Sequence, residues 1–277
     1  MKTVIIPTLN EEENIGRLIR LVYEHMEDDE VSVLVVDDES IDRTREVVSD
    51  LESEYNVKLL VRRGCRGLAS AVRYAAGVAG NGPVAVMDAD LSHHPRYLPL
   101  LFQKIEEGYD VAVGSRYTSG NRVKGWPGHR VALSKGAGTI ASALLRARVT
   151  DPMSGFVALK SSEILVSGIR HSDYKFLLEI LATDDSLRVA EVPIDFQNRR
   201  YGKSKLKGST TLRYINQVIR HIVTRDRRSL LSNHEAAKAP DPNHPVDASS
   251  PRQTDIPHVE VPQSQGDSRS DTVGVRG

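Results

Sequence analysis

The amino-acid sequence predicts an α/β fold built on a mostly parallel, doubly wound sheet with helices on both faces. Short runs rich in Val and Ile, bounded by turn residues, alternate along the chain with longer segments whose apolar residues recur at helical spacing. This strand–helix–strand order implies right-handed crossovers and therefore parallel strands. The 277 residues suffice for one large domain or two small ones, and the equal totals of 37 basic and 37 acidic residues argue against a general nucleic-acid binder.

Six short segments are expected to form strands because they are apolar, rich in β-branched residues and flanked by turn residues. They cover residues 3–6, 31–36, 58–61, 83–87, 110–114 and 188–196. Asn10 and Glu13 resemble a capping box before the first helix, whose apolar stripe begins at Ile15. Helices are expected at this stripe and around residues 47–51, 68–75, 98–105, 132–148, 174–183 and 210–225.

The folded domain is expected to end near residue 232. Residues 233–277 contain no aromatic residue and hold six of the 13 prolines, so they lack the apolar area to offset the entropy of ordering and are predicted to be disordered. A binding motif within this tail is the alternative. No stretch approaches the roughly 20 apolar residues that span a bilayer, and the apolar start is too short for a signal peptide. With Cys65 as the single cysteine, these features predict a cytoplasmic protein without an internal disulfide.

Polar residues follow four of the predicted strands, at the edge where parallel sheets bind ligands. These residues are Pro7–Glu11, Asp37–Ser40, Asp88–Asp90 and Ser115–Tyr117. An Asp-x-Asp sequence at such an edge suits a hard divalent cation, Mg²⁺ or Mn²⁺, with water and substrate phosphates as the other ligands. We expect Asp42 to act as a helix cap, and His93 and His94 to be loop residues because adjacent histidines lack the spacing of a zinc pair.

A basic segment follows the last predicted strand. It contains Arg199, Arg200, Lys203 and Lys205 among Gly and Ser residues, which suits a loop that holds phosphates. A dinucleotide-binding fingerprint, a phosphate-binding P-loop and a hydrolase nucleophile elbow are all absent from the sequence.

Several motifs together resemble family 2 glycosyltransferases of GT-A fold, in the branch of the dolichol-phosphate (polyprenyl-phosphate) mannose synthases. The motifs are Ile6-Pro-Thr-Leu-Asn-Glu-Glu, Val36-Asp-Asp-Glu-Ser, Met87-Asp-Ala-Asp-Leu-Ser, Gly114-Ser-Arg-Tyr, Asp151-Pro-Met-Ser-Gly-Phe and Gly202-Lys-Ser-Lys-Leu. The first three mark the superfamily, whereas Tyr174-Lys-Phe-Leu-Leu-Glu and the segment from Arg199 to Leu206 are typical of the polyprenyl-phosphate branch.

The resemblance implies a set of site residues. The nucleoside side would comprise Pro7, Leu9, Glu11 and Asp38. The diphosphate and its cation would lie against Asp88, Ala89 and Asp90, with Asp90 as the direct metal ligand. The pyrophosphate and acceptor phosphate would contact Arg116, Lys175, Arg199 and Lys205. Two positions depart from the family pattern: many relatives have an aromatic residue at Leu9, and Ser92 stands where Gln is frequent.

The implied activity is inverting transfer of mannose from GDP-mannose to a dolichyl or polyprenyl phosphate, with Mg²⁺ or Mn²⁺ on Asp88 and Asp90. The acceptor phosphate is already an anion near neutral pH, so no general base is assigned; Asp90, Arg116, Arg199 and Lys205 would carry the reaction. Three alternatives stay open: another donor such as UDP-glucose, a receiver-like module with acids at its strand ends, and a non-catalytic nucleotide-binding scaffold.

The lipid acceptor implies contact with the cytoplasmic face of a membrane. Residues 210–231 combine an apolar stripe with five arginines, a pattern of helices that lie in the lipid interface. A helix packed on the sheet with its basic face in water fits the pattern equally well. Residues 132–148 are a second candidate, and some family members use a separate membrane-anchoring subunit.

Overall fold

The structure is a computed structural model that describes residues 1–26, 31–118, 149–170 and 176–196. All of these lie in the first of two units, residues 1–232 and 233–277, into which the chain divides. The strands are β1 Lys2–Thr8, β2 Val31–Asp37, β3 Val57–Val61, β4 Val84–Val86, β5 Val111–Ser115, β6 Val157–Leu159 and β7 Val189–Pro193. The helices are α1 Ile15–His25, α2 Thr44–Leu51, α3 Leu68–Val78, the 3₁₀ turn η1 Pro95–Tyr97, α4 Leu98–Glu106, α6 Ser162–Gly168 and α7 Phe176–Thr183.

The seven strands found in the described residues form one sheet in the order β3-β2-β1-β4-β6-β5-β7. β1 pairs in parallel with both β2 and β4, in a register that runs from Lys2 opposite Val31 to Thr8 opposite Asp37. β6 alone is reversed, because it pairs antiparallel with β4 and with β5. The predicted α/β class with a mostly parallel sheet is therefore confirmed, and all six predicted strands are present.

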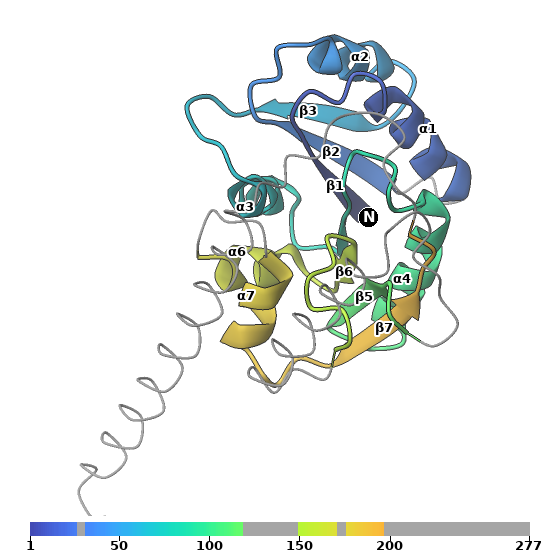
Figure 1. The fold of residues 1–277 in the computed structure, drawn as a ribbon, viewed down its shortest axis with the longest axis vertical. Helices are drawn as coiled ribbons and strands as arrows, with labels where there is room; N and C mark the ends of the chain where they lie inside the picture. The colour runs from blue at the N-terminus through green and yellow to red at the C-terminus, as the bar shows by residue number, and fades with distance from the viewer. Residues whose placement is uncertain (27–30, 119–148, 171–175, 197–277) are drawn as a thin grey trace, which may run out of the picture. The chain divides into compact units, whose positions relative to one another are not determined.

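Alternate side chains of the strands enter two separate cores, one on each face of the sheet. Val4 and Ile6 of β1 join the core beneath α1, α2 and α4, whereas Ile5 joins the core beneath α3, α6 and α7. Figure 1 shows these two groups of helices on opposite sides of the sheet. The stripe predicted from Ile15 is wholly buried, because α1 covers the sheet with that face.

One prediction about these elements is corrected by the structure, and two elements are added to those predicted. The capping box is wrong: α1 begins at Ile15, and Asn10 instead accepts a hydrogen bond at Oδ1 from the backbone of Ile41. β6 and α6 were not predicted, since three apolar residues and a seven-residue helix give too short a pattern. The helix expected at 174–183 is observed as α7, and the segments 132–148 and 210–225 lie outside the described residues. Among the described helices, none has the length and apolar content to cross a membrane.

Candidate active site

The carboxyl ends of β1, β2, β4 and β5 meet at one edge of the sheet, because these strands all run in the same direction. Three described non-glycine residues have positive φ angles: Asn10 at 55°, Glu39 at 61° and Leu91 at 58°. Each follows one of the strands β1, β2 and β4 within a few residues. Such conformations cluster at functional sites, where surrounding contacts hold them in place. The edge predicted to bind ligands is thus also the edge where the backbone is most constrained.

Asp37 at the end of β2 holds the turn that follows it. It is fully buried and accepts hydrogen bonds from the backbone N–H of Ser40 at 2.9 Å, from the Ser40 hydroxyl and from the Thr8 hydroxyl at 3.4 Å. The Nε atom of Arg45 lies 3.7 Å away. Both carboxylate oxygens thus accept hydrogen bonds from neighbouring strand ends, so we assign Asp37 to the architecture of the site.

Asp38, the predicted nucleoside contact, lies in a buried ion pair with Arg62. The guanidinium donates from Nε and from a terminal nitrogen, each at 2.7 Å from a carboxylate oxygen, and the N–H of Gly67 donates at 3.0 Å. Arg62 also bonds the Ser70 hydroxyl and the Gly67 carbonyl, which ties β2 and β3 to the start of α3. Asp38 therefore reaches the edge already paired, and sequence spacing gave no sign of this partner.

The turn after β1 is fastened to the start of α2. The N–H groups of Asn10 and Glu11 donate to the hydroxyls of Ser40 and Thr44, both at 2.8 Å, and the carboxylate of Glu11 accepts from Asn14. Asp42 accepts hydrogen bonds from Thr44, the first residue of α2, but the N-cap residue of this helix is Arg43, so the prediction that Asp42 caps it is wrong by one position. Burial acts to raise the pKa of Asp42, but these hydrogen bonds outweigh it and lower the pKa. Pro7 lies on β1 opposite Val36, and Leu9 follows the strand end.

The Asp-x-Asp segment places one carboxylate toward solvent and one inside. The side chain of Asp88 is 36% exposed, whereas Asp90 is only 4% exposed and its Oδ1 atom accepts from the N–H of Ser92 at 3.0 Å. Ala89 between them is buried in the core under α4. The segment thus follows β4 into a tight turn with Asp88 as its accessible carboxylate.

The loop before β6 forms the floor beneath Asp88. The Ser154 hydroxyl donates to the carbonyl of Gly114 at 2.8 Å, which fixes this loop to the end of β5. Gly155 lies directly against Asp88, and a Cβ atom there would come within 2.9 Å of its Oδ2 atom. Only glycine fits without displacing the carboxylate, so this position in the motif from Asp151 to Phe156 has a steric cause.

Arg116, the predicted phosphate ligand, forms a bidentate ion pair with Asp151 of the same loop. Its Nε and terminal nitrogen each lie 2.7 Å from a carboxylate oxygen, and its backbone N–H donates to the same group. Burial acts to lower the pKa of Arg116, and the hydrogen bonds and charge of Asp151 raise it, so the guanidinium stays charged. Asp88 adds to this field. Arg116 therefore supplies positive charge beside Asp88 from a fixed position.

A second acidic residue supports that loop from β7. Glu191 accepts hydrogen bonds from the backbone N–H groups of Thr150 and Asp151 and from the Thr150 hydroxyl. The Thr150 hydroxyl lies 3.0 Å from that of Ser115. The ends of β5 and β7 therefore both hold the loop that carries Asp151.

His93 is a site residue that sequence reasoning missed, because it was expected to be an ordinary loop residue. It is 2% exposed, and its Nδ1 atom lies 3.7 Å from Oδ2 of Asp88. Its ring stacks on Phe156 and meets Phe196 edge-on. Burial lowers the pKa of His93, although the nearby Asp88 acts to raise it. The pairing of residues 93 and 196 across the sheet edge explains the burial, and nothing in the local sequence predicts it.

The remaining predicted site residues, Lys175, Arg199 and Lys205, lie outside the described residues. Within residues 1–26, 31–118, 149–170 and 176–196, no group of three or more Asp, Glu, His or Cys side chains converges as a complete metal site. Two carboxylates at a strand edge, one of them accessible, fit a cation that takes its other ligands from water and substrate phosphates. The donor set is therefore suited to Mg²⁺ or Mn²⁺ rather than to a closed zinc site.

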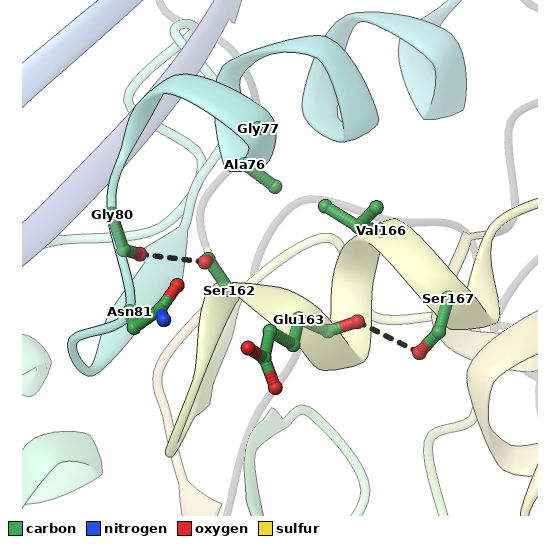
Figure 2. Close-up of a pocket in the computed structure, with 8 residues that line it drawn as sticks. All are labelled: Ala76, Gly77, Gly80, Asn81, Ser162, Glu163, Val166 and Ser167. Carbon is green, nitrogen blue, oxygen red and sulfur yellow. Dashed lines mark hydrogen bonds between the residues drawn. The ribbon is translucent and has the colours of Figure 1, made fainter.

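A pocket of about 510 Å³ lies elsewhere on the molecule, between α3 and α6 (Figure 2). Its lining comprises Ala76, Gly77, Gly80, Asn81, Ser162, Glu163, Val166 and Ser167. It adjoins the chain just before β4 and just after β6, which is the sheet edge opposite Asp88. The Ser162 hydroxyl closes one side by donating to the Gly80 carbonyl at 2.6 Å. This pocket does not belong to the candidate active site.

The mostly parallel sheet and the acidic residues at its strand ends define an α/β protein of the GT-A class. Comparison with known proteins agrees with this class. Residues 3–163 match the family "Glycosyl transferase family 2", and the chain belongs to that family.

A dolichol-phosphate mannosyltransferase of Pyrococcus furiosus is 40% identical over 79% of the chain, which spans 62% of that protein's length. A dolichol-phosphate mannosyltransferase of Mycosarcoma maydis is 34% identical over 78% of the chain and 77% of its own length. A polyprenol monophosphomannose synthase of Mycolicibacterium smegmatis is 36% identical over 74% of this chain and 81% of its own length.

Among solved structures, glucosyl-3-phosphoglycerate synthase of Mycobacterium tuberculosis, in complex with Mn²⁺, UDP and glucosyl-3-phosphoglycerate, superposes with a TM-score of 0.62. The match covers 81% of this chain and 79% of that one at 21% identity, a level that establishes the shared fold.

Proposed function

We propose that the chain is an inverting glycosyltransferase that moves mannose from GDP-mannose to a polyprenyl or dolichyl phosphate. The observation that carries the proposal is the accessible carboxylate of Asp88, next to Asp90 and Arg116, at the ligand-binding edge of a family 2 fold. The names of three relatives at 34–40% identity support the same sugar and acceptor class.

The nucleoside side of the donor would lie over the ends of β1 and β2. Pro7, Leu9 and Glu11 border this part of the edge, and Asp38 forms its base together with Arg62. Because the Asp38 carboxylate is already paired, its role toward the nucleoside would be to shape the pocket and to hold Arg62 there. The diphosphate would then lie over the end of β4, against Asp88, Ala89, Asp90 and Ser92.

Asp88 and Asp90 would hold the divalent cation, with Asp90 as the direct ligand once donor phosphates are present. When bound, Mg²⁺ or Mn²⁺ acts as a Lewis acid that stabilises charge on the leaving diphosphate. Arg116 adds a fixed positive charge from the end of β5, where Asp151 keeps it oriented. Lys175, Arg199 and Lys205, assigned from the sequence motifs, would hold the pyrophosphate and the acceptor phosphate.

The acceptor needs no general base, because a phosphate monoester has its second pKa near ~6 and is anionic at neutral pH. The protein's task is to bring two anions together and to align them, which is the work of the charged side chains above. In-line attack on an α-linked nucleotide sugar gives a β-linked lipid phosphate sugar. The reaction is therefore proposed to proceed with inversion.

Membrane association is proposed to be peripheral, at the cytoplasmic face, and to involve residues 210–231. Their basic and apolar composition supports this, with residues 233–277 as a tail beyond the catalytic domain. A separate membrane-anchoring subunit is a further element of the proposal. Binding to anionic vesicles of a chain ending at residue 232, compared with a chain ending at residue 209, tests the role of this segment.

Transfer of labelled mannose from GDP-mannose to a polyprenyl phosphate, with Mn²⁺ or Mg²⁺, tests the activity. We expect metal-dependent label in the lipid fraction, loss of this label in Asp90→Asn, and unchanged label in Glu107→Gln, an exposed residue at the C-terminal end of α4. A parallel reaction with UDP-glucose identifies the donor. Label from UDP-glucose alone would show that UDP-glucose rather than GDP-mannose is the donor. Transfer from neither donor would overturn the proposed activity.

A further inference from the structure

We propose that His93 is a positioning residue that orients the Asp88 carboxylate for cation binding, through an N–H group at Nδ1. The inference deepens the proposed function and rests on its metal site. It concerns which oxygen of Asp88 faces the cation. It arises from one juxtaposition: beside the accessible carboxylate of the site lies a buried imidazole that has no hydrogen-bond partner within the described part of the chain.

The first observation is that, among the residues the structure describes, neither ring nitrogen of His93 finds a hydrogen-bond partner although the side chain is buried. Buried polar atoms in proteins are nearly always satisfied, and an exception calls for a functional explanation. The Oδ2 atom of Asp88 lies 3.7 Å from Nδ1 of this ring. This separation is slightly longer than a hydrogen bond, so a shift of well under 1 Å would form one.

The second observation is that the ring is held in orientation by aromatic side chains rather than by polar contacts. It stacks on Phe156 with 5.3 Å between the ring centroids and an interplanar angle of 22°. Its centroid lies 5.4 Å from that of Phe196, with an interplanar angle of 66°. The backbone of residue 93 also pairs with that of residue 196. The ring plane is thus fixed, and the nitrogen that faces Asp88 is set by packing.

The third observation is that Asp88 is confined on a second side. Gly155 lies so close that a Cβ atom there would be 2.9 Å from Oδ2 and 3.1 Å from Oδ1 of Asp88. With His93 near Oδ2 and Gly155 against the carboxylate, the freedom of the group is restricted while its side chain stays 36% exposed. A hydrogen bond from Nδ1 to Oδ2 would leave Oδ1 to face the cation. Carboxylates that bind metals are commonly held by such outer hydrogen bonds, and the loss of an outer partner weakens metal affinity by about 10–100-fold.

Three substitutions distinguish the contribution of the Nδ1 donor from that of the aromatic ring. His93→Phe keeps the volume and the aromatic contacts but has no donor. His93→Asn places an amide nitrogen close to the position of Nδ1, whereas His93→Gln places one close to that of Nε2. The probe is Mn²⁺, titrated into the full chain in the presence of GDP, with free Mn²⁺ measured by electron paramagnetic resonance. Thermal unfolding of each variant monitors the fold.

We expect His93→Phe and His93→Gln to weaken Mn²⁺ binding by tenfold or more, and His93→Asn to stay within about threefold of the native chain. Should His93→Phe fail to fold, the comparison of Asn with Gln carries the same information. Native affinity in His93→Phe, or equal losses in Asn and Gln, would overturn the role of Nδ1 while leaving the proposed function intact. Absence of Mn²⁺ binding by the native chain would overturn the metal site and this inference together.

Discussion

Replacing Asp151 by Asn is expected to destabilise the folded domain strongly. The substitution keeps the size of the side chain but removes the negative charge that Arg116 faces. Asp151 is 1% exposed and Arg116 10% exposed at the side chain, and three hydrogen bonds of 2.7, 2.7 and 3.1 Å join them. The amide would also direct N–H groups toward a guanidinium that can only donate. The result is a buried cation without its counter-charge.

The size of the effect follows from the burial. Removing one partner of a buried ion pair costs about 3–5 kcal/mol, because the other charge stays desolvated. For a domain of this size, 1 kcal/mol corresponds to roughly 2–4 °C in the unfolding temperature, so Asp151→Asn should lower it by about 6–20 °C. Exposed pairs contribute only about 0.2–1 kcal/mol. The Lys104–Glu107 pair, with both side chains more than one-third exposed, therefore provides the matched control through Glu107→Gln.

Urea unfolding followed by circular dichroism measures both variants against the native chain. A decrease of less than about 1 kcal/mol in the free energy of unfolding of Asp151→Asn, similar to that of Glu107→Gln, would refute the inference that Asp151 and Arg116 form a buried ion pair. It would mean that Arg116 is solvated and contacts substrate phosphates directly, the role that the sequence motifs imply. A large loss with unchanged slope in urea would support a structural clamp on a charged group that also acts on Asp88.

Three further substitutions test other contacts. Gly155→Ala should displace the carboxylate of Asp88 and reduce metal-dependent transfer at least tenfold, with an unfolding temperature within a few degrees of native; full activity would contradict the close approach. Gly114→Ala introduces a Cβ atom 2.8 Å from the ring of a buried phenylalanine and should lower the free energy of unfolding in urea by about 1–3 kcal/mol. An unchanged urea midpoint would show that the surrounding side chains shift to accept the methyl group. Arg62→Met leaves Asp38 buried and unpaired and should cost about 3–5 kcal/mol; a loss near zero would place Asp38 in solvent.

The sheet and its ligand-binding edge could be predicted because both follow from local patterns. Each predicted strand is a short β-branched run, and the residues after it are polar, so the topology alone brings Asp88 and Arg116 to one edge. The Asp-x-Asp sequence carries its chemistry in three adjacent residues. These are the parts of the site in which sequence neighbours are also spatial neighbours.

The missing parts of the site depend on contacts between distant segments. The pair of Arg62 with Asp38 joins positions 24 residues apart, and that of Arg116 with Asp151 joins positions 35 apart, so spacing gives no hint of either. His93 reads as a loop residue because its burial comes from Phe196, more than a hundred residues later. The capping-box prediction failed for a related reason: Asn10 bonds the loop after β2 instead of its own helix.

The reversed direction of β6 is what completes the candidate site. Because β6 runs antiparallel to β4 and β5, its beginning rather than its end lies at the edge where those strands finish. The loop that precedes it is thereby brought beside Asp88, where Gly155 admits the carboxylate, Asp151 holds Arg116, and Phe156 stacks on His93. A parallel strand at this position would place the same loop at the opposite edge. One reversed strand of three residues thus brings the accessible carboxylate, its neighbouring cation and its neighbouring imidazole under a single structural element.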